Sequence, residues 1–434
     1  MAALEAERPG PPAGARRAVA AWCLFDWANS AFPTIVQTFV FSTFFVKAVA
    51  ADPERGNAQL GLANSGAAIL IAVLSPLIGA VADRSGRRKP WLAALTLLSV
   101  AATAGLWFVR ATPADALLGL VLLGVATLGF ELGIAFYNAM LADTVPADRL
   151  GRISGWGWGL GYAGGLACLV LSQLLFVDAE LPPFGLDRAA FEHVRIVMPL
   201  AALWFALFAL PLFLLVPDRP ATGLPLGAAL RGGLADLIAT LRQLRRHRNV
   251  ARFLLAKMIY IDGLNTLFLF GGAYAGVTFG MTLPEVLTFG ILLNIAAGAG
   301  AAAFAWIDDW IGAKPTIAIA LAALSLLGAA VLLVQDRGWF YALALAIGIF
   351  LGPTQAASRS LMARLAPPAQ RTGFFGLYNF AGKATAFLGP ALFGGATWLF
   401  DSQRAGMATI LPFFLVGLLL LRGVREPRPA GHIA

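Results

Sequence analysis

Residues 79–89 read Gly79-Ala-Val-Ala-Asp83-Arg84-Ser-Gly86-Arg87-Arg88-Lys89. The charged part of this segment, 83–89, lies between two long apolar runs at 59–82 and 91–109. An α-helix needs about 20 apolar residues to cross a hydrocarbon core of about 30 Å, and both runs reach that length. The segment is therefore predicted to be a loop at a membrane surface that joins two membrane-spanning helices.

The same count along the rest of the chain predicts a polytopic membrane protein. Apolar runs of spanning length occur at 19–50, 59–82, 91–109, 115–142, 153–177, 194–216, 252–275, 285–306, 316–335, 339–363, 373–398 and 405–422. Charged residues make up 13% of the 434 residues, against about 25% in soluble proteins. So few charges could not cover a soluble surface, and we predict an all-α fold with twelve transmembrane helices.

The distribution of basic residues predicts the orientation. Of the lysines and arginines in the predicted loops, 22 lie on the side of both termini and of the loop after the sixth span, and five lie on the other side. By the positive-inside rule both termini are then cytoplasmic. We expect a multi-pass protein of the cell membrane, specifically a bacterial inner membrane, whose basic loops contact anionic lipids and not nucleic acid.

The chain divides into two halves that share short, similar sequences. Three short sequences recur in the same order at offsets of 222, 226 and 236 residues. The pairs begin at Pro146 and Pro368, at Asp83 and Asp309, and at Asp26 and Asp262. Parallel repeats of six helices are typical of transporters whose site lies between the halves near the middle of the membrane.

These observations predict five regions. They are a cytoplasmic tail at 1–18, a six-helix bundle at 19–216, a linker at 217–251, a second, pseudo-symmetric six-helix bundle at 252–422 and a cytoplasmic tail at 423–434. The linker carries leucines at helical spacing with arginines between them, which predicts an amphipathic helix on the inner leaflet. These residues are Leu230, Leu234, Leu237, Leu241 and Leu244, with Arg242, Arg245 and Arg246.

Ionisable residues inside the spans are the candidate site residues, because each is costly in a membrane unless it is paired or hydrated. Counted along the helices, Glu131, Asp262 and Lys383 lie near mid-membrane. Asp26 lies closer to the cytoplasmic side, and Lys257 and Arg359 lie about one turn from it. For Lys257 and Arg359 we weigh an alternative in which their side chains reach the membrane interface.

Each charged residue has a polar neighbour on the same helix face. Asn29 follows Asp26 and Asn265 follows Asp262 at a spacing of three, so each Asp–Asn pair lies on one helix face. The two acids could bind a substrate ammonium or a proton, or each could serve as a structural pair or a cap. The other neighbours are Asn138 for Glu131, Gln355 for Arg359 and Asn379 for Lys383.

Glu131 is the preferred proton carrier, and Lys383 the preferred anchor for a substrate carboxylate or phosphate. The alternative for both is a permanent ion pair with each other. Tyr137 and Tyr378 are the aromatic residues most expected to line the cavity.

The segment at residues 79–89 resembles the loop signature of the major facilitator superfamily. Further segments resemble a narrower family, the vacuolar amino-acid effluxers linked to autophagy and their bacterial relatives. These segments are Phe25-Asp-Trp-Ala-Asn-Ser-Ala-Phe32, Phe136-Tyr-Asn-Ala-Met-Leu141, Gly161-Tyr-Ala-Gly-Gly165, Gln355-Ala-Ala-Ser-Arg-Ser360, and Phe374-Phe-Gly-Leu-Tyr378 with Gly382-Lys383 and Gly389-Pro390.

The superfamily resemblance implies a gate latch in each half. Asp83 would cap the start of span eleven near residues 372–374, supplemented by Arg84, Gly86, Arg87 and Arg88. Asp309, followed by Gly312, would do the same at the start of span five. Because Ala313-Lys314 stands where the first copy has arginines, the second latch is expected to be weaker.

Together these features predict a secondary active transporter that moves a small polar or zwitterionic solute, an amino acid or short peptide, by proton-coupled efflux. A drug or lipid extruder of the same fold is the first alternative. A lipid-modifying membrane enzyme and a scaffold or sensor without transport are the others. We expect a monomer. We also expect no cofactor and no metal, because the two cysteines and three histidines form no metal-ligand pattern.

Overall fold

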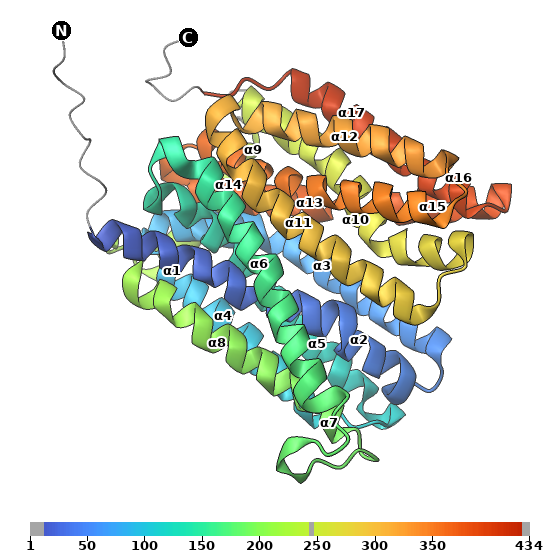
Figure 1. Ribbon diagram of the computed structural model, residues 1–434. Coiled ribbons are helices and arrows are strands. Elements are labelled where there is room, and N and C mark those ends of the chain that lie inside the picture. Colours follow the sequence, from blue (N-terminus) through green and yellow to red (C-terminus); the bar gives the residue numbers. More distant parts are fainter. Residues whose placement is uncertain (1–12, 243–246, 428–434) are drawn as a thin grey trace, which may run out of the picture.

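The computed structural model describes residues 13–242 and 247–427, and every regular element in these ranges is a helix (Figure 1). The first half begins with α1 (Ala13–Asn29), which continues through η1 (Phe32–Phe39), α2 (Phe41–Phe44) and η2 (Phe45–Val49) as one long span. It continues with α3 (Pro53–Ser85), α4 (Lys89–Gly105), α5 (Ala116–Thr144), α6 (Leu150–Ser172) with η6 (Gln173–Val177), α7 (Glu192–Arg195) and α8 (Val197–Leu215).

The second half repeats this plan after a linker helix, α9 (Leu226–Arg242). Its helices are α10 (Arg248–Phe279), α11 (Leu283–Ile311), α12 (Ala313–Leu333), α13 (Arg337–Leu365), α14 (Arg371–Lys383), α15 (Leu388–Phe400), α16 (Gln403–Ala408) and α17 (Ile410–Arg422). Short 3₁₀ turns occur at η3 (Leu106–Phe108), η4 (Pro113–Asp115), η5 (Ala147–Arg149), η7 (Pro183–Gly185) and η8 (Pro368–Gln370).

The predicted all-α membrane fold is confirmed, with one difference in how a predicted span is built. Within the described residues, eleven helical stretches are long and apolar enough to cross a membrane. The predicted span at 373–398 is interrupted, because α14 ends at Lys383 and α15 begins only at Leu388. The break directly follows one of the charged residues that the sequence placed near mid-membrane.

The most extensive contacts between the two halves are made by two helix pairs, α3 with α14 and α6 with α11. Glycines let these backbones approach closely. A Cβ atom at Gly79 would lie 2.6 Å from the carbonyl oxygen of Thr372, and one at Gly155 would lie 2.6 Å from that of Ala301. The two contacts occupy corresponding places in the repeat, which is consistent with an internal duplication.

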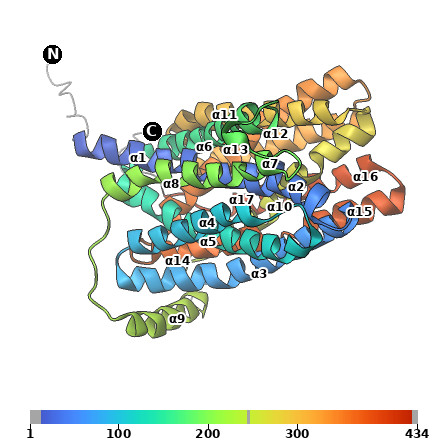
Figure 2. The ribbon, with the colours of Figure 1, turned by 90° about the horizontal axis from the view of Figure 1, so that it is seen from below.

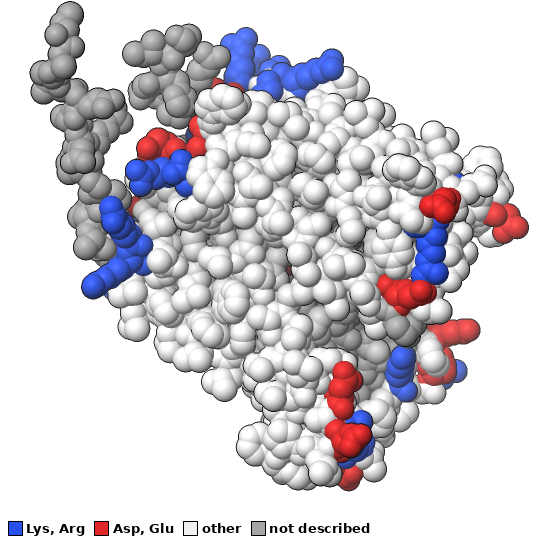
Figure 3. Space-filling model, in the orientation of Figure 1, with Lys and Arg blue, Asp and Glu red and all other residues white. Residues whose placement is uncertain are grey.

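The start of α1 and the end of α17 lie at the same end of the molecule, which we call the terminal face (Figure 1). Basic side chains gather at this end, whereas acidic ones are frequent at the other (Figure 3). The loops that join α3 to α4, α5 to α6, α11 to α12 and α13 to α14 also lie at the terminal face.

The linker helix α9 runs alongside the terminal end of α3 (Figure 2). Arg84 on α3 makes a two-pronged salt bridge to Asp236 on α9, with Nε–Oδ2 and Nη2–Oδ1 distances of 2.5 and 2.9 Å. The guanidinium lowers the pKa of the Asp236 carboxyl below its ordinary value. The predicted amphipathic helix is thus docked on protein along this side. Leu244, Arg245 and Arg246 lie outside the described residues, as do the side chains of Leu230, Leu234, Leu241 and Arg242.

Candidate functional site

A cavity of about 680 Å³ lies between the two bundles, on the side away from the terminal face. Its walls come from α1 and η1, α6, α10 and α11, along residues 30–39, 158–169, 265–272 and 286–294. Most wall residues are apolar. The larger polar side chains are Gln37, Trp158, Tyr162, Asn265 and Asn294.

Between this cavity and the terminal face lies a cluster around Arg359 of α13. Its guanidinium pairs with Asp26 of α1 at 2.9 Å and donates to the hydroxyl and carbonyl oxygens of Ser154 of α6 at 2.9 and 2.7 Å. It also lies 3.5 Å from the amide oxygen of Asn138 of α5. One cation of the second bundle thus ties three helices of the first.

Aromatic rings enclose the same guanidinium. It lies 4.8 Å from the ring of Trp22, 5.7 Å from that of Tyr137 and 5.7 Å from that of Trp158, which also lines the cavity. Only 3% of the Arg359 side chain is exposed. The interpretation in which Arg359 reaches the membrane interface is therefore wrong. That interpretation rested on the position of Arg359 along the helix, which does not show which helix face the side chain occupies.

Tyr137 is fully buried beside this cluster. Its hydroxyl donates to the carbonyl oxygen of Trp22 at 3.0 Å, and the indole of Trp22 donates to the carbonyl oxygen of Tyr137 at 3.1 Å. The two rings stack with centroids 4.5 Å apart. Tyr137 therefore lies in the core of the first bundle and not on the cavity wall where the sequence analysis placed it.

A second pair of opposite charges joins the bundles between α5 and α14. Lys383 Nζ lies 2.7 Å from Glu131 Oε1, and the Asn379 amide donates to the carbonyl oxygen of Glu131 at 2.8 Å. The Lys383 side chain is 31% exposed, far more than that of Arg359. Thr127, one turn before Glu131, accepts a hydrogen bond from Gln37 on the cavity wall, so the pair lies within a turn of the cavity.

Lys257 of α10 lies close to this second pair. Its ammonium donates to the carbonyl oxygen of Tyr378 at 3.1 Å and lies 3.8 Å from the centre of the Tyr378 ring. Because Lys257 is buried, the alternative that it reaches the interface is also wrong. Tyr378 binds this lysine and does not appear among the residues that line the cavity.

Asp262, one turn further along α10, is buried, and neither of its carboxylate oxygens has a hydrogen-bond partner among the described residues. Asp26, by contrast, is paired with Arg359. The related acids of the two halves are therefore not equivalent.

The remaining polar residues divide between the cavity and the core. Asn265 lines the cavity directly, and Gln355 donates to the hydroxyl of Tyr162 on its wall at 3.0 Å. Asn29 is buried, with a side-chain NH₂ that has no partner among the described residues.

At the terminal face, Asp83 caps the start of α14. Its carboxylate accepts from the backbone NH groups of Thr372 at 3.1 Å and Gly373 at 2.7 Å. Gly86 permits the turn that follows, because its φ is +83° and a Cβ there would lie 2.3 Å from the carbonyl oxygen of Pro220.

A buried arginine strengthens this first latch. Arg88 donates to the Thr372 hydroxyl at 2.7 Å, lies 3.6 Å from Asp83 and pairs closely with Asp143 at the end of α5. Asp143 also pairs with Arg219 and Arg371. Of the other arginines predicted to help, Arg84 binds the linker helix instead, and Arg87 is exposed with no ion pair among the described residues.

Asp309 makes the corresponding contact at the start of α6. Its carboxylate accepts from the backbone NH of Gly151 at 2.8 Å and lies 3.5 Å from Arg152. Arg364 at the end of α13 pairs with Asp308 at 2.8 Å and lies 3.7 Å from Asp309.

The tail beyond α17 completes the second latch. Glu426 pairs with Arg364 at 2.5 Å and accepts from the backbone NH groups of Ala313 and Lys314. Gly312, with φ of +101°, leaves room for the Glu426 carboxylate. The reason for expecting a weaker second latch fails, because Arg152 and Arg364 supply the cations that the loop after Gly312 lacks.

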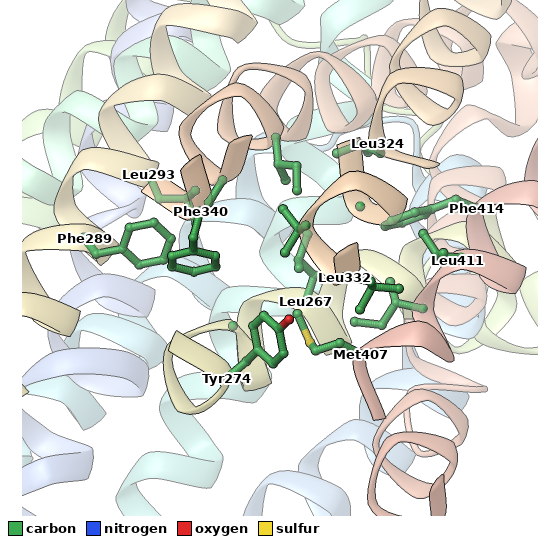
Figure 4. A pocket seen from close by; sticks show the side chains of 16 residues that line it. Leu267, Tyr274, Phe289, Leu293, Leu324, Leu332, Phe340, Met407, Leu411 and Phe414 are labelled. Carbon is green, nitrogen blue, oxygen red and sulfur yellow. The ribbon is translucent and has the colours of Figure 1, made fainter. Parts of the chain in front are cut away.

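A further cavity, of about 60 Å³, lies inside the second bundle (Figure 4). Leucines, phenylalanines, Met407 and similar apolar residues line it. Among the lining residues, Tyr274 carries a hydroxyl group. It lacks the polar groups that would orient a polar solute, so the space between the bundles is the better candidate site.

Sequence reasoning missed Ser154, Tyr162, Gln37, Asp143 and Glu426. Ser154 and Tyr162 fall in a glycine-rich apolar run that reads as packing surface, and a neutral hydroxyl there carries no signal of its own. Asp143 and Glu426 lie at span ends, where a charge is ordinary. For Asp143 the available signal was Arg364 at the equivalent position of the duplication, whereas Glu426 had no such signal.

Two six-helix bundles that meet around a cavity, with a capped helix start in each half, define a membrane transporter of the major facilitator type. The solved structures agree on the fold. The transporter FucP in the outward conformation has a TM-score of 0.74 at 14% identity and covers 96% of this chain and 99% of its own. The human organic anion transporter MFSD10 has a TM-score of 0.72 at 18% identity, covering 95% of this chain and all of its own.

The family follows from the sequence comparison. Residues 58–430 match the model described as "Vacuole effluxer Atg22 like", and the chain belongs to that family. The MFS-type transporter YxiO of Bacillus subtilis is 28% identical over 93% of this chain and 94% of its own length. Autophagy-related protein 22 of Cryptococcus neoformans is 26% identical over 64% of this chain, but only 53% of that protein is covered. The protein is thus a multi-pass membrane transporter and not a lipid-modifying enzyme.

Proposed function

We propose that this transporter exports a small zwitterionic solute, an amino acid or a short peptide, in exchange for protons. The terminal face would be cytoplasmic, in the cell membrane of a bacterium, and the monomer would be the working unit. The basic side chains at that face support the orientation, and the relation to YxiO supports a bacterial membrane.

The observation that carries the proposal is the Glu131–Lys383 pair. Its members come from different bundles and offer one charge of each sign, at 2.7 Å from each other and partly exposed. A zwitterion carries the same two charges, so its ammonium and carboxylate can replace each partner in turn. Binding would then separate the pair and change the contact between the bundles, which is the coupling that alternating access requires.

The proton sites would be Glu131 and Asp262. Glu131 loses its counter-ion when a substrate carboxylate takes Lys383, and a carboxylate left unpaired in a membrane protein favours protonation. Asp262 is buried and has no ion pair among the described residues. Asp26 fits this role less well than the sequence suggested, because Arg359 satisfies it in this structure.

The two helix caps would act as the cytoplasmic gate. Both are made in this structure, while the cavity lies on the other side of the Arg359 cluster. The Arg359–Asp26 pair would form an inner layer of the same gate, because it joins the bundles between the cavity and the caps.

An extruder of apolar drugs or lipids is the second candidate, and the cavity wall favours it. Leu166, Leu169, Leu267, Phe268 and Phe289 are among the lining residues. This alternative assigns no role to a charge pair between the bundles.

Proteoliposomes that contain the purified protein distinguish the two. With a proton gradient across the membrane, labelled amino acids should move against their concentration, and Glu131→Gln should abolish the gradient-driven flux while the protein stays folded. Asn294→Ala, on the cavity wall but away from the pair, serves as a matched control that should retain the proton dependence. Full gradient-driven flux in Glu131→Gln, or transport of apolar dyes only, would contradict the proposal.

A further inference from the structure

A groove of about 910 Å³ opens at the terminal face between α1, the α5–α6 loop, α6 and α8. It is separate from the cavity between the bundles and shares no lining residue with it. Its lining combines three arginines at the rim, Arg16, Arg17 and Arg149, with an apolar wall. That combination has no use in the transport mechanism described above.

The rim arginines carry charge that the protein does not neutralise. Arg16 and Arg17 are exposed and have no ion pair among the described residues. Within the part of the chain that the structure describes, the one ion contact of Arg149 is with Asp148 at 3.9 Å, and both side chains are largely exposed. Such an exposed ion pair contributes little to the free energy of folding.

The one acid on the lining, Asp143, does not offset them. Its carboxylate is shared by Arg88, Arg219 and Arg371 in the first latch. The groove therefore presents a net positive rim to whatever occupies it.

The wall below the rim has the character of a surface that faces lipid. Trp156, Leu160 and Leu215 line the groove and are 40%, 39% and 49% exposed. From Arg17 to Leu24 the wall descends seven residues along α1, or about 10 Å at the rise of a helix. A groove of this depth accommodates the upper part of a lipid acyl chain when the lipid phosphate lies at the rim.

We propose that the groove is a binding site for one anionic phospholipid of the leaflet at the terminal face. The phosphate and headgroup would lie among Arg16, Arg17 and Arg149, and an acyl chain would lie along Trp156, Leu160 and Leu215. Basic pockets between transmembrane helices at a membrane surface recognise such headgroups, and these headgroups differ from zwitterionic ones because they lack the cationic group that neutralises the phosphate.

The test is a lipid titration of the purified full-length chain in detergent, followed by native mass spectrometry and thermal unfolding. Dioleoyl phosphatidylglycerol should bind and raise the melting temperature more than dioleoyl phosphatidylcholine does. In Arg16→Gln/Arg17→Gln/Arg149→Gln the affinity for phosphatidylglycerol should fall on the order of 100-fold, since each arginine contributes about a factor of five.

A matched triple variant controls for the loss of charge. Arg231, Arg422 and Arg425 lie outside the groove lining, and Arg231→Gln/Arg422→Gln/Arg425→Gln should keep the preference for phosphatidylglycerol. Ala20→Trp tests the groove without changing charge, because Ala20 is an exposed lining residue of α1. It should weaken lipid binding, whereas Leu326→Trp on the exposed side of α12 should not.

Three results would overturn the proposal. They are equal binding of the two lipids, unchanged affinity in both the groove triple variant and Ala20→Trp, and an equal rise in melting temperature with inorganic phosphate alone. If the triple variant does not fold, Ala20→Trp against Leu326→Trp decides the question by itself.

Discussion

The two latches make the same contact in opposite electrostatic surroundings. In each, an aspartate at the end of one helix accepts from backbone NH groups at the start of a helix in the other bundle. Around Asp83, one further acid, Asp143, gathers three arginines. Around Asp309 the arrangement is inverted, because one arginine, Arg364, gathers three acids.

The central residues of the two networks occupy equivalent places in the duplication. Asp143 ends α5 and Arg364 ends α13, at an offset of 221 residues that matches the other repeats. The comparison shows that the duplicated fold specifies the cap and its charged support, but not the sign of the support. It also predicts that the second latch depends more on a single residue, because its central residue, Arg364, is 8% exposed, whereas Asp143 at the centre of the first is 29% exposed.

Loss of Arg364 should have the largest effect. Arg364→Gln leaves Asp308, Asp309 and Glu426 without their shared cation, with side chains only 3%, 7% and 13% exposed. Removing one partner of a buried ion pair costs about 3–5 kcal/mol, and we expect a loss of unfolding free energy in that range. Thermal and denaturant unfolding of the purified protein measures it. Arg364→Lys, which keeps the charge, should lose less, and equal loss in both variants would show that charge is not the cause.

Loss of Asp143 should cost less. Asp143→Asn leaves three arginines without their shared acid, but the Asp143 side chain is 29% exposed, so water can solvate the change. We expect a loss of about 1.5–3 kcal/mol, the usual range for hydrogen bonds to a charged group. The same unfolding experiment gives the ranking, and an Asp143→Asn effect larger than that of Arg364→Gln would invert the comparison.

The smallest effect is expected where the linker helix joins the first latch. Arg84→Gln removes the salt bridge to Asp236, in which both side chains are about 40% exposed. Such pairs contribute about 0–1 kcal/mol and weaken with salt.

The pH dependence of this contact has a defined sign. Because the pKa of Asp236 is lowered in the folded protein, the stabilisation is present above the unfolded value of about 3.9 and is lost only as pH falls through the folded pKa. Between pH 5 and 8 the difference in stability between wild type and Arg84→Gln should be flat. A slope in that range would point to another titrating group.

The fold was predictable because the hydropathy pattern and the repeated motifs indicate the membrane spans and the two halves. The features that the sequence did not predict have physical reasons. Counting apolar residues does not detect the break after Lys383, because residues 384–387 are as apolar as a span requires. The caps of Asp83 and Asp309 followed from the superfamily resemblance, because their partners are backbone NH groups at fixed helix starts.

The partners of buried side chains were less accessible to sequence reasoning. Depth along a helix placed Arg359 and Lys257 near the interface, but only the helix face determines whether a cation meets water or another side chain. The Glu131–Lys383 contact was considered as an alternative to separate roles, and the structure shows the two in contact. Glu426 lies in a tail whose return to α12 and α13 nothing in the sequence signals.

Two latches with different electrostatic support hold the terminal face closed. Ala147 and Ala369 are exposed equivalents at this face, one in each half, and suit spin labels as Ala147→Cys and Ala369→Cys once Cys23 and Cys168 are replaced by serine. Electron–electron double resonance should give one short distance in the parent protein. Asp309→Asn should add a population at longer distance, as should Asp83→Asn, and the double variant should be dominated by it. An unchanged distance distribution in the folded double variant would contradict the account.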